Sequence, residues 1–206
     1  MIAEPSASSV KVWGPPAVLA GISLLLMLGG PHLSQILRYD RAAVAAGEWY
    51  RLFTGNLVHL GWWHLLFNAL SLALLVLLCP EALSWGEWLR RVVLIGSGMS
   101  LCLYFFMPAL KSYVGLSGLV YGLFALGLGR QALRKDEIGI ACLVFLAARI
   151  TWELVKGAPA SETELLGGGV VAESHLYGVL CALLYAGLAY GVRSAHGQFF
   201  KQSGNA

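Results

Sequence analysis

The chain has 206 residues, of which 58% are hydrophobic and only 12% are charged. Soluble domains carry about 25% charged residues, so this composition excludes an ordinary soluble protein and predicts an integral membrane protein with one helical domain. The net charge of +3 is small and spread over loop ends, which argues against nucleic-acid binding. The four cysteines lie in or at the ends of apolar runs, at spacings that match no metal motif.

Six apolar segments divide the chain. The first covers residues 13–28, and Gly29-Gly30-Pro31 ends it. A long loop over about residues 31–60 follows, with enough aromatic side chains to rest on the membrane surface. The other segments are residues 62–79, 92–107, 117–128, 138–154 and 174–192, and a polar, Gly-rich loop separates the last two. The expected fold is an all-α membrane protein, a six-helix bundle over residues 13–193 between short tails at residues 1–12 and 194–206.

The basic residues predict the orientation of this bundle. Six crossings place both termini on the same side of the membrane. That side carries Lys11, Arg90, Arg91, Arg130, Arg134, Lys135, Arg193 and Lys201, whereas the other carries Arg38, Arg41, Arg51, Lys111 and Lys156. Because cytoplasmic loops are enriched in Lys and Arg, we expect both termini to be cytoplasmic.

The fourth apolar segment begins at Ser117 and is short for a membrane crossing. From Ser117 to Arg130 a helix rises about 20 Å, whereas the hydrocarbon layer is about 30 Å thick, so Ser117 would lie roughly 10 Å below the outer interface. Gly115 and Gly118 flank the serine. A helix start leaves backbone N–H groups unpaired, which suits a buried nucleophile with its own oxyanion donors. The alternative is a Ser–Gly pair that serves only helix packing.

Two other segments place polar side chains at a similar depth. His64 and Asn68 share one helix face, His59 precedes them, and His175 lies in the same outer half of the last segment. Polar side chains inside a membrane are costly unless paired and are functional candidates. Each histidine alone is better explained as a structural hydrogen-bonding group, but their common depth with Ser117 favours a shared site.

Small residues indicate which helices meet. They lie four positions apart in the fourth and sixth segments, as Gly118 with Gly122 and as Gly178 with Ala182. This spacing lets helix backbones approach closely, so the face that carries His175 is expected beside Ser117. Tyr121, one turn deeper, either fixes the ring of His175 or fills the core.

In combination these residues resemble the rhomboid intramembrane serine proteases. The motifs are Gly115-Leu116-Ser117-Gly118 with Tyr121, His59 with His64 and Asn68, His175 followed by Gly178, and Glu48-Trp49-Tyr50-Arg51 in the first loop. The resemblance implies that Ser117 is the nucleophile and His175 the base of a dyad with no carboxylate. It implies an oxyanion hole of His64, Asn68 and the Ser117 backbone N–H, supported by His59, Gly115, Gly118, Tyr121 and Gly178. Ala182 departs from the family pattern, since many rhomboids carry a second glycine there.

Residues 52–59 and 173–178 look most similar to rhombosortases, the compact branch of the family. This resemblance implies substrates of one class, exported bacterial proteins that end in a Gly-Gly-containing, membrane-anchored sorting tail. The expected partners are these substrates and the lipid bilayer, with no nucleic acid, cofactor or metal. The implied location is the bacterial inner membrane, with the site open to the periplasmic side.

Four further interpretations compete with this one. The runner-up is a generic rhomboid protease that cuts other single-pass proteins. A different class is a rhomboid-like protein that binds membrane clients without cutting them, but retention of Ser117 with His175 argues against it. A small-solute transporter is disfavoured, because the two halves show no repeat and no charged site at the midplane. A metal site of His59, His64 and His175 is conceivable, but no carboxylate or thiolate is expected at their depth.

Overall fold

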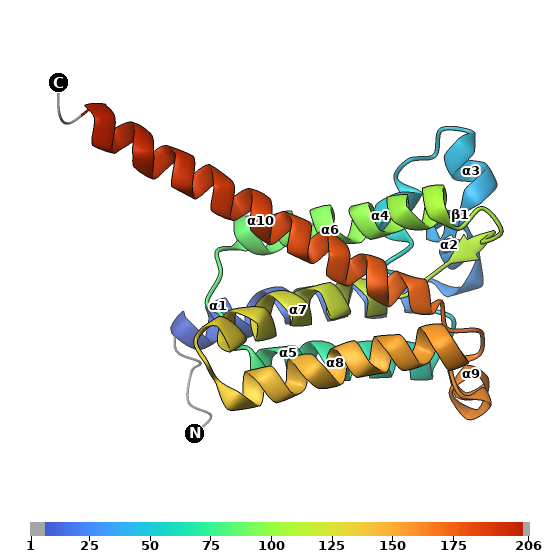
Figure 1. The fold of residues 1–206 in the computed structure, drawn as a ribbon. Coiled ribbons are helices and arrows are strands. Elements are labelled where there is room, and N and C mark those ends of the chain that lie inside the picture. Colours follow the sequence, from blue (N-terminus) through green and yellow to red (C-terminus); the bar gives the residue numbers. More distant parts are fainter. Residues whose placement is uncertain (1–6, 204–206) are drawn as a thin grey trace.

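The computed structural model describes residues 7–203, which are almost entirely helical (Figure 1). Within this range all six predicted segments form helices: α1 (Ala7–Leu28), α5 (Trp62–Leu78), α6 (Trp85–Phe106), α7 (Ser117–Leu133), α8 (Glu137–Lys156) and α10 (Ala172–Ser203). The prediction of an all-α membrane protein is confirmed.

Helix length separates these helices into two groups. In the described residues, four stretches are long and apolar enough to cross a membrane: Ser9–Leu28, Trp85–Phe106, Glu137–Lys156 and Ala172–Gly191. Helices α5 and α7 have 17 residues each, about 25 Å of helix, less than the hydrocarbon thickness of about 30 Å. The protein therefore crosses the membrane several times, with two short helices among the long ones.

Several helix ends differ from the predicted ones. Helix α6 begins before residue 92 because Ser84 and Glu87 form a capping box, in which each side chain accepts a hydrogen bond from the other residue's backbone N–H. Helices α1 and α10 extend into both predicted tails, and residues 1–6 and 204–206 lie outside the described residues. The cytoplasmic position of these ends stays a prediction.

Helix α7 is the core helix. It packs against α5, α6, α8 and α10, and Figure 1 shows it between α10 and α8. Its side chains are buried almost continuously from Gly118 to Leu128, and Leu119 and Leu123 join Leu72 in the main apolar cluster. A helix that is apolar on all sides is expected in such a central position. Ser117 thus stands at the N-terminal end of the most enclosed helix.

The segment predicted as a long first loop is folded. It contains α2 (Gly30–Leu37), β1 (Tyr39–Asp40), α3 (Arg41–Ala45) and α4 (Arg51–Thr54). Strand β1 pairs antiparallel with β2 (Ser112–Tyr113), which places Tyr39 opposite Tyr113, and the Gly115 N–H donates to the Gly55 carbonyl at 3.1 Å. The first loop therefore braces the segment that leads into Ser117. The loop predicted before the last helix likewise contains α9 (Ala160–Leu166).

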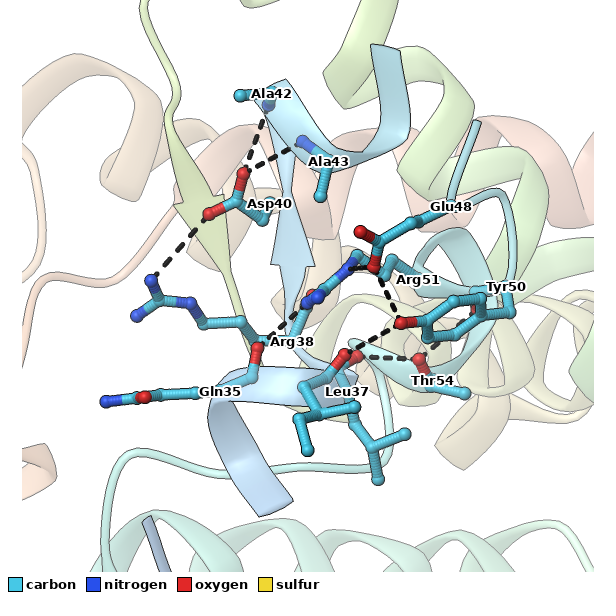
Figure 2. A network of polar contacts seen from close by, with 11 residues as sticks. Gln35, Leu37, Arg38, Asp40, Ala42, Ala43, Glu48, Tyr50, Arg51 and Thr54 are labelled. Atoms are coloured by element: carbon cyan, nitrogen blue, oxygen red, sulfur yellow. Dashed lines mark hydrogen bonds and ion pairs between the residues drawn. The ribbon is translucent and has the colours of Figure 1, made fainter. Parts of the chain in front are cut away.

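Arg51 holds this first loop together (Figure 2). Its Nε donates to Glu48 Oε2 at 2.7 Å, and its Nη1 donates to the carbonyls of Gln35 and Arg38 at 2.8 and 3.0 Å. The hydroxyl of Tyr50 also donates to Glu48 Oε2, and these hydrogen bonds from Tyr50 and Arg51 lower the pKa of the Glu48 carboxyl. Arg51 is only 9% exposed, so the Glu48–Arg51 motif acts as a structural clamp.

Contacts between charged residues agree with their predicted grouping on two sides. Glu81, between α5 and α6, pairs with Arg91 of α6 at 2.8 Å and with Arg130 of α7. At the opposite end of the bundle the Arg41 N–H donates to the Lys111 carbonyl at 2.9 Å. Residues predicted to share a side therefore do lie together.

Candidate active site

Ser117 and His175 meet where α7 and α10 begin. Ser117 is the first residue of α7, and His175 lies in the first turn of α10. The distance between Ser117 Oγ and His175 Nε2 is 3.0 Å, a hydrogen-bond distance. His175 is 4% exposed. The structure thus brings together the two residues that the sequence predicted as nucleophile and base.

Direct contact between the backbones of α7 and α10 allows this meeting. A Cβ atom on Gly118 would lie 2.7 Å from the Ser174 carbonyl oxygen, and one on Gly122 would lie 2.6 Å from that of Gly178. A Cβ atom on Gly178 would overlap the Gly118 carbonyl oxygen. Ala182, the position that departs from the rhomboid pattern described above, is fully buried without preventing the contact. The predicted glycine packing is therefore present.

Tyr121 stacks on the imidazole of His175. The ring centroids are 4.0 Å apart and the ring planes differ by 6°. A stacked aromatic ring restricts rotation of the imidazole out of its plane while leaving both ring nitrogens free for hydrogen bonds. Of the two interpretations offered for Tyr121, contact with the His175 ring is the one that the structure shows.

A carboxylate lies beside His175, so the expectation of a dyad without one is wrong. Oε2 of Glu153, in α8, is 2.6 Å from His175 Nδ1, and Glu153 is 2% exposed. An ionised carboxylate only accepts hydrogen bonds, so with Glu153 ionised Nδ1 would carry the proton of a neutral ring and Nε2 would accept from the Ser117 hydroxyl. The premise used against a metal site is also wrong, because a carboxylate does reach the depth of these histidines.

Arg149 accompanies this carboxylate. Arg149 lies four residues before Glu153 in α8, and its Nη2 is 2.7 Å from Glu153 Oε1. That oxygen accepts no well-aligned hydrogen bond, so the contact is an ion pair. The same nitrogen donates to both carboxylate oxygens of Glu162 in α9, at 3.0 and 2.8 Å. Sequence reasoning missed the place of Glu162 in this group, because Glu162 lies in a segment predicted as a polar loop.

His64 and Asn68 lie on the other side of Ser117, around Gly115. Gly115 has φ of +120°, and a Cβ atom there would lie 2.6 Å from His64 Nε2 and 3.8 Å from Asn68 Nδ2, so both the backbone angle and the space require glycine. His64 Nδ1 accepts a hydrogen bond from the Leu60 N–H at 3.4 Å. The neutral His64 ring therefore carries its proton on Nε2 and offers a donor beside Ser117.

His59 supports this side of the site. Its ring meets that of His64 edge-on, with centroids 5.0 Å apart and planes at 79°. His59 is 4% exposed, and within the described residues its ring nitrogens have no hydrogen-bond partner. His59 thus packs against His64, a predicted oxyanion donor, and His64 lies between His59 and Ser117.

A cavity of about 1140 Å³ connects these groups. Its wall includes Ser117, His175, Glu153, His64 and Asn68, and residues of α1, α2 and α9 complete it. Ligand pockets typically measure about 300–1,000 Å³. The cavity therefore has room for an extended peptide segment next to the Ser117 hydroxyl.

We expect Asn68→Ala and His64→Ala to lower kcat by about 10²- to 10³-fold, the usual effect of losing one donor to an oxyanion. KM should change little, because such donors act mainly in the transition state. The measurement is steady-state proteolysis by purified variants whose folding is checked by thermal denaturation. Full turnover by both folded variants would make the second helix merely structural.

The fold and this arrangement define a multi-pass, all-α membrane protein with a buried Ser–His pair at a glycine-packed helix junction. The chain belongs to the rhomboid family: the rhomboid domain matches residues 46–191. The matched region contains Ser117, His175, Glu153, His64 and Asn68.

A relative with a curated name supports this assignment. The Bacillus subtilis (strain 168) protein named "Putative rhomboid protease YdcA" is 38% identical to this chain over 98 residues. The match covers 47% of this chain and 48% of that relative, so the similarity extends over about half the length of each protein.

Proposed function

We propose that this protein is an intramembrane serine endopeptidase. The observation that carries the proposal is the 3.0 Å contact between Ser117 Oγ and His175 Nε2 on the wall of a large cavity. Membership of the rhomboid family and the name of the Bacillus subtilis relative support the same activity.

In the proposed reaction, Ser117 Oγ attacks the scissile carbonyl carbon and its proton passes to His175 Nε2. The substrate oxygen becomes an oxyanion, stabilised by donors from His64, Asn68 and the Ser117 backbone N–H. When the C–N bond breaks, His175 gives the proton to the leaving amine. A water molecule then repeats the sequence on the acyl-enzyme and releases Ser117.

We further propose that the substrates carry a C-terminal, membrane-anchored tail with a Gly-Gly pair. Two features support this: the similarity of residues 52–59 and 173–178 to rhombosortases, and the small amount of protein outside the helices that could bind a soluble domain. Each glycine destabilises a helix by about 1 kcal/mol relative to alanine, so the tail would unwind there and enter the site extended. A glycine pair also suits the narrow approach beside Gly115.

A matched set of substrates tests the tail preference. One soluble domain is fused to tails that differ only in having Gly-Gly or Leu-Leu, and mass spectrometry of the product's C-terminus reports cleavage after co-expression. We expect the Gly-Gly tail to be cut and the Leu-Leu tail to remain intact while both insert in the membrane. Equal cutting of the two tails would leave a generic rhomboid protease.

We propose that the protein resides in the bacterial inner membrane with both termini in the cytoplasm. The excess of Lys and Arg on the terminal side supports this orientation, and it places Ser117 toward the periplasm. Cysteine labelling of Arg134→Cys and Ser161→Cys variants with a membrane-impermeant maleimide would report the two sides.

A further inference from the structure

A continuous series of polar contacts runs from Ser117 through four helices. It passes from Ser117 Oγ to His175 at 3.0 Å, from His175 to Glu153 at 2.6 Å, from Glu153 to Arg149 at 2.7 Å, and from Arg149 to Glu162 at 2.8 Å. The Glu153 side chain is completely shielded from solvent, and that of His175 is 5% exposed. A buried carboxylate is energetically costly unless it is paired, and inside a membrane it is a candidate functional residue.

We propose that Glu153 is a positioning residue for His175, so that the site works as a Ser–His–Glu triad, and that Arg149 keeps Glu153 in place as a carboxylate. This inference rests on the proposed serine-protease function, which it deepens by assigning a third residue to the reaction.

The geometry gives Glu153 two effects on His175. It fixes the tautomer, because a carboxylate at Nδ1 requires the proton there and leaves Nε2 free to accept the Ser117 proton. It also stabilises the imidazolium that forms when Ser117 attacks, because the carboxylate then faces a full positive charge at 2.6 Å. The proton itself stays between Ser117, His175 and the leaving amine, and Glu153 remains ionised throughout.

Tyr121 and Glu153 fix different properties of the His175 ring. Stacking on Tyr121, at 4.0 Å, fixes the plane of the imidazole but does not choose between its two tautomers. The Glu153 carboxylate supplies that choice. The positive charge of Arg149 in turn balances the negative charge of Glu153. The Arg149 side chain is 28% exposed and also faces Glu162 at the edge of the cavity.

A purely structural role is the alternative: Arg149 with its two carboxylates would simply join α8 to α9. The two roles separate at Glu162. Glu162→Gln weakens the connection between α8 and α9 but leaves the contact of Glu153 with His175, whereas Glu153→Gln removes the charge beside His175 with almost no change in shape.

The experiment measures the reactivity of Ser117 with a fluorophosphonate, in which Ser117 Oγ bonds to phosphorus, fluoride leaves, and His175 takes the serine proton. The detergent-solubilised full-length protein is compared with Glu153→Gln, Glu153→Asp, Glu162→Gln and Ser117→Ala. We expect Glu153→Gln to label about 10⁴-fold more slowly, the size of loss in kcat seen when the orienting carboxylate of soluble serine proteases is altered. Glu153→Asp should recover part of this loss, and Glu162→Gln, at the far end of the series of contacts, should slow labelling clearly less than Glu153→Gln does.

A kinetic comparison on a cleaved substrate should give the same order in kcat, with KM nearly constant. Labelling of Glu153→Gln at the normal rate would overturn the proposal. Equal losses in Glu153→Gln, Glu153→Asp and Glu162→Gln would also overturn it and leave the structural role.

A readout that does not depend on activity separates this proposal from the proposed function. In ¹⁵N-histidine spectra, assigned by the signals lost in His175→Asn, we expect His175 with its proton on Nδ1 and a low-field proton signal that disappears in Glu153→Gln. A proton on Nε2 would refute the role of Glu153 even if Glu153→Gln failed to fold. If the unmodified protein showed the expected tautomer but Ser117 never reacted, the protease proposal would fail while the orientation of His175 stood.

Discussion

Replacing Ser117 with alanine should reduce proteolysis to background while the protein stays folded. Ser117 Oγ is the atom that would attack the substrate, and His175 cannot replace it, so the loss should reach several orders of magnitude, about 10⁶-fold in kcat where such residues have been removed from soluble serine proteases. The change removes one oxygen from the cavity wall and creates no overlap, so the thermal stability should hardly change. Co-expression with a tail-bearing substrate, followed by mass spectrometry, measures the effect.

The matched control is Ser97→Ala, the same chemical change in α6 at a residue that does not line the cavity. It should cleave like the unmodified protein. A folded Ser117→Ala protein that cleaves as well as the control would end the serine-protease proposal. If the unmodified protein itself bound such substrates without cutting them, the protein would be a client-binding relative instead.

Gly178→Ala should strongly destabilise the protein. The added methyl group would overlap the Gly118 carbonyl oxygen, so α10 must move away from α7 or the chain must bend locally. Overpacking of this kind costs about 1–3 kcal/mol or more. Separation of the helices would also lengthen the contact between Ser117 and His175, so proteolysis should fall together with the unfolding temperature.

Gly187→Ala provides the control in the same helix. A Cβ atom at Gly187 has no neighbour within 4 Å, and alanine favours a helix by about 1 kcal/mol over glycine. Gly187→Ala should therefore be neutral or slightly stabilising. Equal melting temperatures for Gly178→Ala and Gly187→Ala would mean that α7 and α10 are not in backbone contact.

The sequence predicted that Ser117 and His175 meet because its signals lie at helix starts and in residue spacing. Ser117 and His175 each occupy the first turn of an apolar segment, and a common depth required only the rise of a helix per residue. Gly118 and Gly178 indicated the pair of helices that meet. These features depend on local geometry, which survives in the folded protein.

The carboxylate beside His175 was not predicted, because the contact joins residues far apart in the sequence. One oxygen of Glu153 contacts Arg149 four residues earlier, but Oε2 contacts His175, 22 residues away in another helix. A usable signal was present: Arg149 and Glu153 are two charges on one face of an apolar helix, and Trp152 and Val155 are exposed on the remainder of it. Intramembrane charges of this kind point toward a functional interior.

The first loop was beyond prediction for a different reason. Its order comes from single long-range contacts, such as the pairing of β1 with β2 and the hydrogen bonds from Arg51 to two backbone carbonyls. Neither leaves a periodic pattern in the sequence, because each strand has only two residues. From its composition we could predict only that the first loop rests on the membrane surface through its aromatic residues.

The distance along the chain between Ser117 and His175 bears on how this protein is made. A ribosome delivers α7 before α8, and α10 last of all, and proteins generally fold from the N-terminus during synthesis. Ser117 lacks its proposed base, His175, until α10 has left the ribosome, entered the bilayer and packed Gly178 against α7. A nascent chain in the insertion machinery, surrounded by the membrane segments of other new proteins, therefore lacks the proposed site until α10 has been made.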